Sequence, residues 1–169
     1  MQFDLRRFIA SGRADWAQTF ECDLSGRDFA GSRIEAPVTA SFTAQADGDE
    51  VRMTLRASAS VHGECARCLD PVSFDAKVEA EWTARERDLD DPDFELPLNA
   101  AGSIDLDDWL YQEFLFQIPG VLLCSPDCPG LCPQCGRKRP CSCPAAPEPS
   151  AQPDARLSVL KSQIGRAHV

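Results

Sequence analysis

Cysteine spacing is the feature that most limits what this chain can fold into. Two C-x-x-C pairs, a C-x3-C pair and a C-x-C pair supply eight of the nine cysteines. No export signal precedes them, because charges interrupt each apolar stretch of the first sixteen residues. In a reducing compartment, such clusters indicate metal ligation rather than disulfides. The pattern therefore predicts a cytoplasmic, metal-stabilised protein.

Eight clustered cysteines form two sets of four, the number of ligands that a structural zinc ion takes. Such closed sets leave no coordination position for water, so we expect two structural zinc ions and no catalytic one. The preferred division joins each C-x-x-C pair to the nearest unclaimed cysteines. It gives Cys65, Cys68, Cys124 and Cys128 for one ion, and Cys132, Cys135, Cys141 and Cys143 for the other.

Three runs of alternating apolar and polar residues surround the first C-x-x-C pair, at 38–44, 51–61 and 72–82. Alternation with a period of two is typical of strands with one buried face, and Asp47-Gly48 marks a turn between the first two runs. The simplest topology is an antiparallel β meander. The first C-x-x-C pair would then be a zinc knuckle at a hairpin tip, between the second and third runs.

A helix is predicted over 106–118, because Leu106, Leu110, Phe114 and Ile118 recur at intervals of four residues. Asp105 can cap its start, and a proline follows its end. We expect the helix to pack on the apolar face of the sheet. The predicted fold class is thus α+β, with a C-terminal module resembling a zinc ribbon.

The predicted domains are a β-rich core with this one helix (1–123), a Cys-rich zinc module (124–143), and a disordered linker with a truncated tail (144–169). For residues 1–35 we expect only one strand or one short helix. The last six residues, IGRAHV, match the translation of a common sequencing adapter. We therefore expect the natural protein to depart from this chain near Gln163, which resequencing of the source locus would test.

The chain carries 27 acidic and 17 basic side chains, a formal net charge of −10. This balance argues against nucleic-acid binding over the whole surface and favours a basic partner. The acidic segment 85–108 is either a solvated loop or a docking strip, with Asp90, Asp91 and Asp93 as candidate contacts. A local basic run either contacts RNA phosphates or balances nearby acids; it comprises Arg137, Lys138 and Arg139.

Signatures of other chemistry are absent from the sequence. It has no phosphate-binding loop, no G-x-G-x-x-G and no serine elbow, and no apolar run long enough to span a membrane. We expect neither an enzyme nor a small-molecule substrate. A redox role for Cys65 and Cys68 is an alternative that requires a helix after the pair, where a strand is expected. Cys22 is expected to be half-buried, and His62 is a dispensable fifth ligand candidate.

Several segments together resemble the YceD family, also described as large ribosomal RNA subunit accumulation proteins. These are ECARCLDPV after a β run, an acidic segment, IDLDDWLYQEFLFQIP, and CSPDCPGLCPQCG followed by C-x-C. The resemblance covers roughly residues 30 to 163 and matches Cys65 and Cys68 to the family's central knuckle. Cys124 and Cys128 match its conserved ligand pair, and the last four clustered cysteines match a module that many members have.

The resemblance implies a role in ribosome biogenesis, in which the protein sustains the level of large-subunit ribosomal RNA. The expected partner is a ribosomal protein or pre-ribosomal RNA. The alternative is a zinc-ribbon module that acts directly on RNA. The oligomeric state is not predicted.

Overall fold

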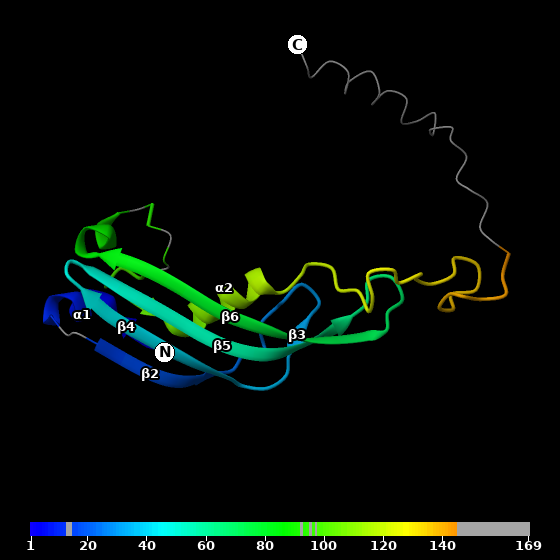
Figure 1. The fold of residues 1–169 in the computed structure, drawn as a ribbon, viewed down its shortest axis with the longest axis horizontal. Coiled ribbons are helices and arrows are strands. Elements are labelled where there is room, and N and C mark those ends of the chain that lie inside the picture. The colour runs from blue at the N-terminus through cyan, green and yellow to red at the C-terminus, as the bar shows by residue number, and fades with distance from the viewer. Residues whose placement is uncertain (13–14, 92, 95, 97, 145–169) are drawn as a thin grey trace, which may run out of the picture. The chain divides into compact units, whose positions relative to one another are not determined.

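A computed structural model describes residues 1–12, 15–91, 93–94, 96 and 98–144. The chain forms two compact units, Met1–Cys128 and Pro129–Val169, and every helix and strand labelled in Figure 1 belongs to the first. The linker and tail predicted at 144–169, including IGRAHV, lie outside the described residues except for Pro144.

One antiparallel sheet of five strands dominates the first unit (Figure 1). Strands β2 (Asp15–Cys22), β4 (Val38–Asp47), β5 (Glu50–Glu64) and β6 (Pro71–Arg85) lie side by side in that order. The short β3 (Arg33–Ile34) pairs with β5 beyond the point where β4 stops pairing. Each of the three alternating runs forms a strand, and the predicted α+β class with antiparallel strands is confirmed.

Two hairpins set the register of the sheet. Asp47 pairs with Glu50, so the first hairpin has a two-residue loop in which Gly48 adopts a φ of 65°. β5 and β6 pair without interruption from Glu50↔Arg85 to Glu64↔Pro71. The tip of this long second hairpin holds residues 65–70, which include the first C-x-x-C pair.

The N-terminal region contains more helices and strands than the single element expected for residues 1–35. It forms β1 (Gln2–Asp4), α1 (Leu5–Ser11), β2 and β3. β1 pairs with β7 (Ser103–Asp105) in a small second sheet. The 3-10 helix η1 (Glu86–Asp90) follows β6 directly.

Helix α2 (Leu106–Gln117) occupies the predicted helical segment. The Asp105 side chain accepts hydrogen bonds from the backbone N–H groups of Asp107 at 3.0 Å and Asp108 at 3.4 Å, which caps the helix. At the other end the Ile118 N–H donates to the Phe114 carbonyl at 3.0 Å, and Pro119 prevents continuation.

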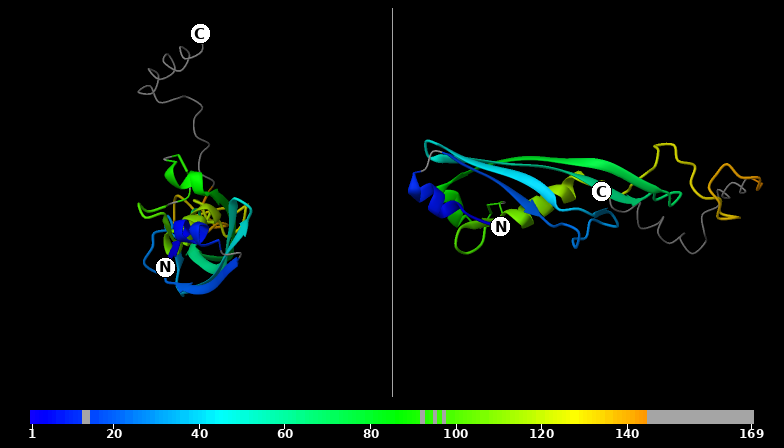
Figure 2. Two further views of the ribbon diagram at one scale, coloured as in Figure 1. Left: turned by 90° about the vertical axis from the view of Figure 1, so that its left-hand side faces the viewer. Right: turned by 90° about the horizontal axis from the view of Figure 1, so that it is seen from below.

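The core lies between α2 and one face of the sheet (Figure 2). Phe42 of β4 is fully buried, and its ring centroid lies 5.9 Å from that of Trp109 on α2 and 4.9 Å from that of Phe3 on β1. Burial of each such side chain contributes about 1.5–3 kcal/mol. These contacts hold α2 under the sheet and so position the chain segment that follows it.

Candidate metal centres

The first cysteine set joins the tip of the β5–β6 hairpin to the segment after α2. Cys65 Sγ lies 3.7 Å from Cys128 Sγ, and Cys68 Sγ lies 3.6 Å from Cys124 Sγ. All four sulfurs lie within 4.8 Å of one another. Because a Zn–S bond is about 2.3 Å, two sulfurs of a tetrahedral zinc site lie about 3.8 Å apart. The set therefore fits a single tetrahedral metal ion.

A tight backbone turn brings Cys65 and Cys68 together. The Cys65 N–H donates to the Asp70 carbonyl at 2.8 Å, and the Leu69 N–H donates to the Cys65 carbonyl at 2.9 Å. Leu69 adopts a φ of 61°, in the left-handed region that usually holds glycine. Strand β6 follows this turn, whereas the redox form of C-x-x-C precedes a helix.

Other contacts hold the second half of the set against the hairpin tip. The Ala66 N–H donates to the Leu122 carbonyl at 2.9 Å. The Arg67 guanidinium donates to the carbonyls of Pro126 at 3.2 Å and Cys128 at 3.1 Å. Arg67 thus orients the segment that carries two of the cysteines. Sequence spacing gave no signal for this role, because its partners are backbone atoms.

The second cysteine set lies within the second unit. The sulfurs of Cys132, Cys135, Cys141 and Cys143 also lie within 4.8 Å of one another. The Cys132 N–H donates to the Arg137 carbonyl at 2.7 Å, and the Gly136 N–H donates to the Cys132 carbonyl at 2.8 Å. These two bonds join the same relative positions as those of the first turn. Both C-x-x-C pairs therefore share one backbone conformation.

Backbone N–H groups in both turns favour the thiolate form of the first cysteine. The N–H of Cys124 lowers the pKa of Cys65 to about 6, and those of Arg67 and Cys68 act in the same direction, against burial. The N–H groups of Cys135 and Gln134 likewise lower the pKa of Cys132 to about 6.

The pKa values of Cys68 and Cys143 are shifted in the opposite direction. The Asp70 N–H favours the Cys68 thiolate, but burial and the neighbouring sulfurs outweigh it and raise the pKa of Cys68 to about 12. The neighbouring sulfur of Cys135, followed by burial, raises the pKa of Cys143 to about 12. Four thiolates this close repel one another, so they coexist only around a cation.

Cys22 and His62 lie outside these sets. Cys22 on β2 is buried in the core rather than half-buried as expected, and burial raises the pKa of its thiol to about 11. His62 is half-buried on β5 opposite Arg33 and Ser73, and it belongs to neither group of four sulfurs.

The acidic residues proposed as partner contacts are exposed, and some have partners within the chain. Asp90 in η1 forms an ion pair with Arg6 at 2.7 Å, and Asp91 accepts a hydrogen bond from the Asp93 N–H at 2.9 Å. In the second unit the basic run Arg137, Lys138 and Arg139 is exposed along its length. Its backbone belongs to the second turn, since the Arg139 N–H donates to the Gly130 carbonyl at 3.0 Å.

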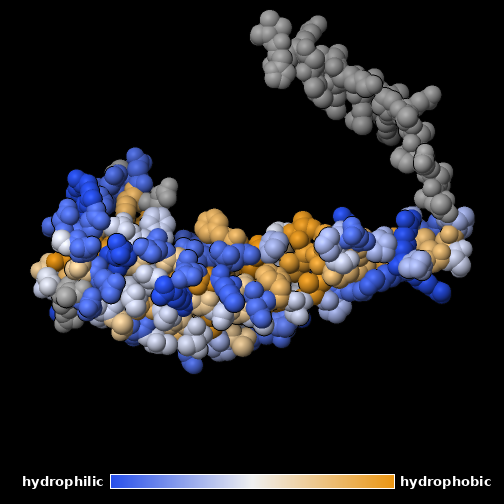
Figure 3. Space-filling model, in the orientation of Figure 1, coloured by the Kyte–Doolittle hydropathy of each residue, from blue (hydrophilic) through white to orange (hydrophobic). Residues whose placement is uncertain are grey.

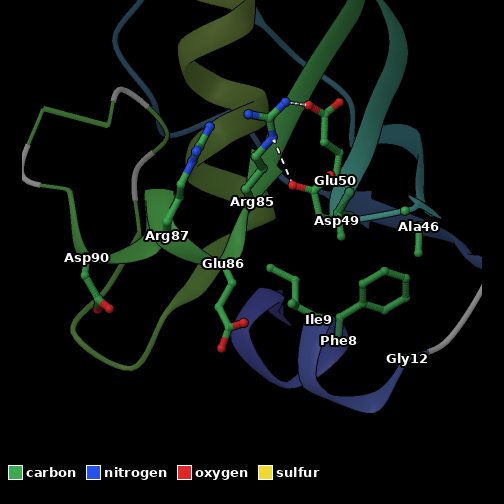
Figure 4. Close-up of a pocket in the computed structure, with 12 residues that line it drawn as sticks. Phe8, Ile9, Gly12, Ala46, Asp49, Glu50, Arg85, Glu86, Arg87 and Asp90 are labelled. Carbon is green, nitrogen blue, oxygen red and sulfur yellow. Dashed lines mark hydrogen bonds and ion pairs between the residues drawn. The ribbon is translucent and has the colours of Figure 1, made fainter.

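A pocket of about 600 Å³, which the sequence did not predict, lies where α1 meets the β4–β5 turn and the end of β6 (Figure 4). Phe8 and Ile9 of α1 form its apolar side. Arg85 lies on its charged side. The Arg85 guanidinium forms an ion pair with Glu50, and its Nε lies 3.7 Å from Asp49 Oδ2. The described residues of its charged side are carboxylates and arginines.

Comparison with known proteins places the chain in a family. The model of the family described as large ribosomal RNA subunit accumulation protein YceD matches residues 53–162, more than half of the chain and all eight clustered cysteines. The chain belongs to this family. The match confirms the resemblance drawn from the sequence motifs.

Curated relatives include uncharacterized proteins of Mycobacterium bovis and of two strains of Mycobacterium tuberculosis. Each is 33% identical over 122 residues, which cover 68% of this chain and 56% of the relative. The chain thus matches little more than half the length of these relatives. No solved structure matches the chain. Among the described residues, no helix has the length and apolarity needed to cross a membrane.

Proposed function

We propose that this chain is a non-enzymatic, cytoplasmic factor that sustains the accumulation of large-subunit ribosomal RNA during ribosome assembly. The observation that carries the proposal is the family match over residues 53–162, which includes both cysteine sets. The closed sulfur sets support a structural role, because four thiolates leave no open position at the metal for a substrate or a reactive water.

Zinc is the metal that we assign to both sets, as a knuckle at the hairpin tip and a ribbon-like module in the second unit. All-thiolate tetrahedral sets are typical of structural zinc, although iron–sulfur proteins also use four cysteines. Zinc would hold the four thiolates of each set and contribute directly to folding free energy. The surface would then supply the contacts to a basic ribosomal protein or to ribosomal RNA.

The acidic strip is one proposed contact for a basic partner. Asp90, Asp91 and Asp93 are exposed next to η1. Changing all three to Asn preserves their size and most of their hydrogen bonds but removes three negative charges. Recovery of a basic ribosomal protein in pull-downs should then fall, and the difference from the unchanged chain should shrink as salt rises, because salt screens the charges that were removed. Undiminished recovery would show that the strip is only a solvated loop.

Direct RNA binding by the second unit is the second candidate, favoured by the exposure of the basic run. Changing Arg137, Lys138 and Arg139 to Ala removes three charges near the second sulfur set without removing a ligand. Salt-dependent binding of a large-subunit ribosomal RNA transcript should be lost. If the transcript binds equally well after the change, or never binds, this candidate fails.

The test of the function itself is genetic. Cells of the source organism that lack the gene should show a lowered ratio of large- to small-subunit ribosomal RNA, which a plasmid copy restores. A copy with Cys65 and Cys68 changed to Ser should restore it poorly, because the first sulfur set is lost. An unchanged ratio in the deletion strain would refute the proposed function.

A further inference from the structure

Strand β6 forms one edge of the sheet and leaves half of its backbone hydrogen-bonding groups without a backbone partner. It pairs with β5 along all of its fifteen residues, and within the described part of the chain no strand lies on its other side (Figure 1). Pro71 stands only at its first position, and the register shows no bulge. Long, regular edges of this kind are the sites at which a further strand can be added.

The register shows which residues present these free groups. In the two-residue turn the Glu50 N–H faces Asp47, so the backbone groups of Glu50 point toward β4. Because backbone groups of successive strand residues point to opposite sides, those of even-numbered β5 residues point toward β4 and those of odd-numbered residues toward β6. Each odd β5 residue lies opposite an even β6 residue, as Ala57 does opposite Val78. The N–H and C=O groups at the free edge therefore belong to Ser73, Asp75, Lys77, Glu79, Glu81 and Thr83.

Exposed apolar side chains gather beside the first half of this edge. α2 packs against β6, and at its last turn Phe116 is 83% exposed. Val121 is 63% exposed just beyond, in the segment whose Leu122 carbonyl bonds the hairpin tip, and Leu69 at that tip is 60% exposed. Figure 3 shows apolar surface over the end of α2 and the segment that follows it. Contiguous apolar surface of this kind marks interaction sites.

Leu69 adds a second, independent indication. It occupies the left-handed position that Gly136 holds in the equivalent turn of the second unit, with φ values of 61° and 68°. Glycine adopts this conformation without steric penalty, whereas leucine does not. The backbone conformation therefore disfavours leucine at this position, and the side chain is 60% exposed. A contact with a partner would account for a leucine at this position.

We propose that the first half of the β6 edge, with Leu69, Phe116 and Val121, docks an extended segment of a basic ribosomal protein as an added strand. This inference rests on the proposed function, whose partner it specifies. The net charge of −10 favours a basic segment and opposes a second copy of the same chain. RNA fits poorly, because Leu69, Phe116 and Val121 are apolar and the nearby Arg67 guanidinium is already bonded to two carbonyls.

The experiment blocks the edge without breaking the sheet. In Lys77→Pro, proline replaces an N–H that points to the free edge, so no bond to β5 is lost. Thr19→Pro is the matched control, because the same register logic places the Thr19 N–H on the free edge of β2, at the other side of the sheet. Leu69→Gly and Phe116→Gln form a second arm that leaves the backbone pairing intact. Thermal unfolding verifies that each variant is folded.

The probes are each purified large-subunit ribosomal protein in turn, a large-subunit ribosomal RNA transcript, and the chain itself. We expect one basic ribosomal protein to bind the full chain, and Lys77→Pro and the apolar variants to weaken it roughly tenfold or more. Thr19→Pro should leave binding unchanged. Should Lys77→Pro not fold, the Leu69→Gly and Phe116→Gln variants decide the matter.

Three outcomes overturn the docking proposal: no ribosomal protein binds, binding ignores the edge and apolar variants, or the variants instead abolish self-association or RNA binding. The proposed function fails separately, if cells without the gene keep normal large-subunit ribosomal RNA. If those cells need the gene but folded Leu69→Gly and Phe116→Gln copies restore the RNA fully, only the docking proposal is wrong.

Discussion

At the scale of single residues, the two C-x-x-C turns hold different residues after the second cysteine. Leu69 and Gly136 share a left-handed backbone, and an added Cβ at Gly136 would meet nothing within 4 Å. The difference between them is therefore one of backbone strain. A leucine in this conformation costs about 1 kcal/mol or more relative to glycine.

The pair gives reciprocal predictions. Leu69→Gly should leave the melting temperature of the first unit unchanged or raise it, because strain relief offsets the greater entropy of the unfolded chain. Gly136→Ala should weaken the second turn by about 1 kcal/mol, seen as faster modification of Cys132 and Cys135 by a thiol reagent. A clear loss of stability in Leu69→Gly would show that its side chain supports the fold.

Gly63 is a position where an added side chain would crowd its neighbours. A Cβ there would lie 2.5 Å from Leu122 Cδ1 and 3.2 Å from Ser32 Oγ. Gly63→Ala should therefore displace Leu122 and destabilise the first unit by about 1–3 kcal/mol, the usual range for overpacking. Denaturant unfolding measures this loss, with Ala66→Ser, an exposed change in the adjoining turn, as the control. An unchanged midpoint would mean that Leu122 moves aside freely.

At the scale of elements, the Asp105 cap makes the stability of α2 depend on pH. Burial raises the pKa of Asp105, but hydrogen bonds from the Asp107 and Asp108 N–H groups outweigh it, so the pKa lies below its ordinary value. A carboxylate with a lowered pKa stabilises the fold above its unfolded pKa, and this contribution is lost as the pH falls below about 4.

Asp105→Ala should consequently lower stability by about 1 kcal/mol at pH 7. The difference from the unchanged protein should shrink as the pH falls through about 4 and below, because the native carboxyl then becomes protonated too. Urea unfolding at a series of pH values measures this, and Asp105→Asn retains a capping oxygen as the control. A deficit that persists undiminished at the lowest pH would assign it to packing instead.

Elements with a strong local pattern could be predicted from the sequence, and those that depend on distant partners could not. The alternating runs specify β4, β5 and β6, and the apolar stripe with its cap specifies α2. β1 has three residues and pairs with β7 about a hundred positions later. Its neighbour α1 has seven residues. Segments this short carry too few residues for a periodic signal, because their stability comes from tertiary packing.

The candidate metal sites show the same division. Thiolate chemistry and spacing were enough to predict the two sets of four. Spacing could not reveal the support from Arg67, because its partners are the backbone carbonyls of Pro126 and Cys128. It also could not reveal that Leu122 packs against Gly63. Both contacts depend on the position of the segment that follows α2, which the core packing around Trp109 determines.

At the scale of the whole molecule, the two sulfur sets should contribute unequally to stability. The first links positions 68 and 124, a separation of 124 − 68 = 56 residues, whereas the second lies within 132–143. A link across a longer loop removes more freedom from the unfolded chain. Cys65→Ser should therefore lower the melting temperature of the first unit substantially, whereas Cys135→Ser should leave the melting temperature of the first unit unchanged. Equal losses in both variants would indicate that the two units unfold together.

The central claim is that two four-sulfur zinc sites hold this chain together. Its most direct test is metal analysis combined with thiol counting on the full chain, purified under reducing conditions. The account predicts two zinc ions per chain and eight thiols that resist a thiol reagent until a chelator is added, with Cys22 protected by burial until the chain unfolds. One ion per chain, iron in place of zinc, or eight thiols that react at once would contradict it.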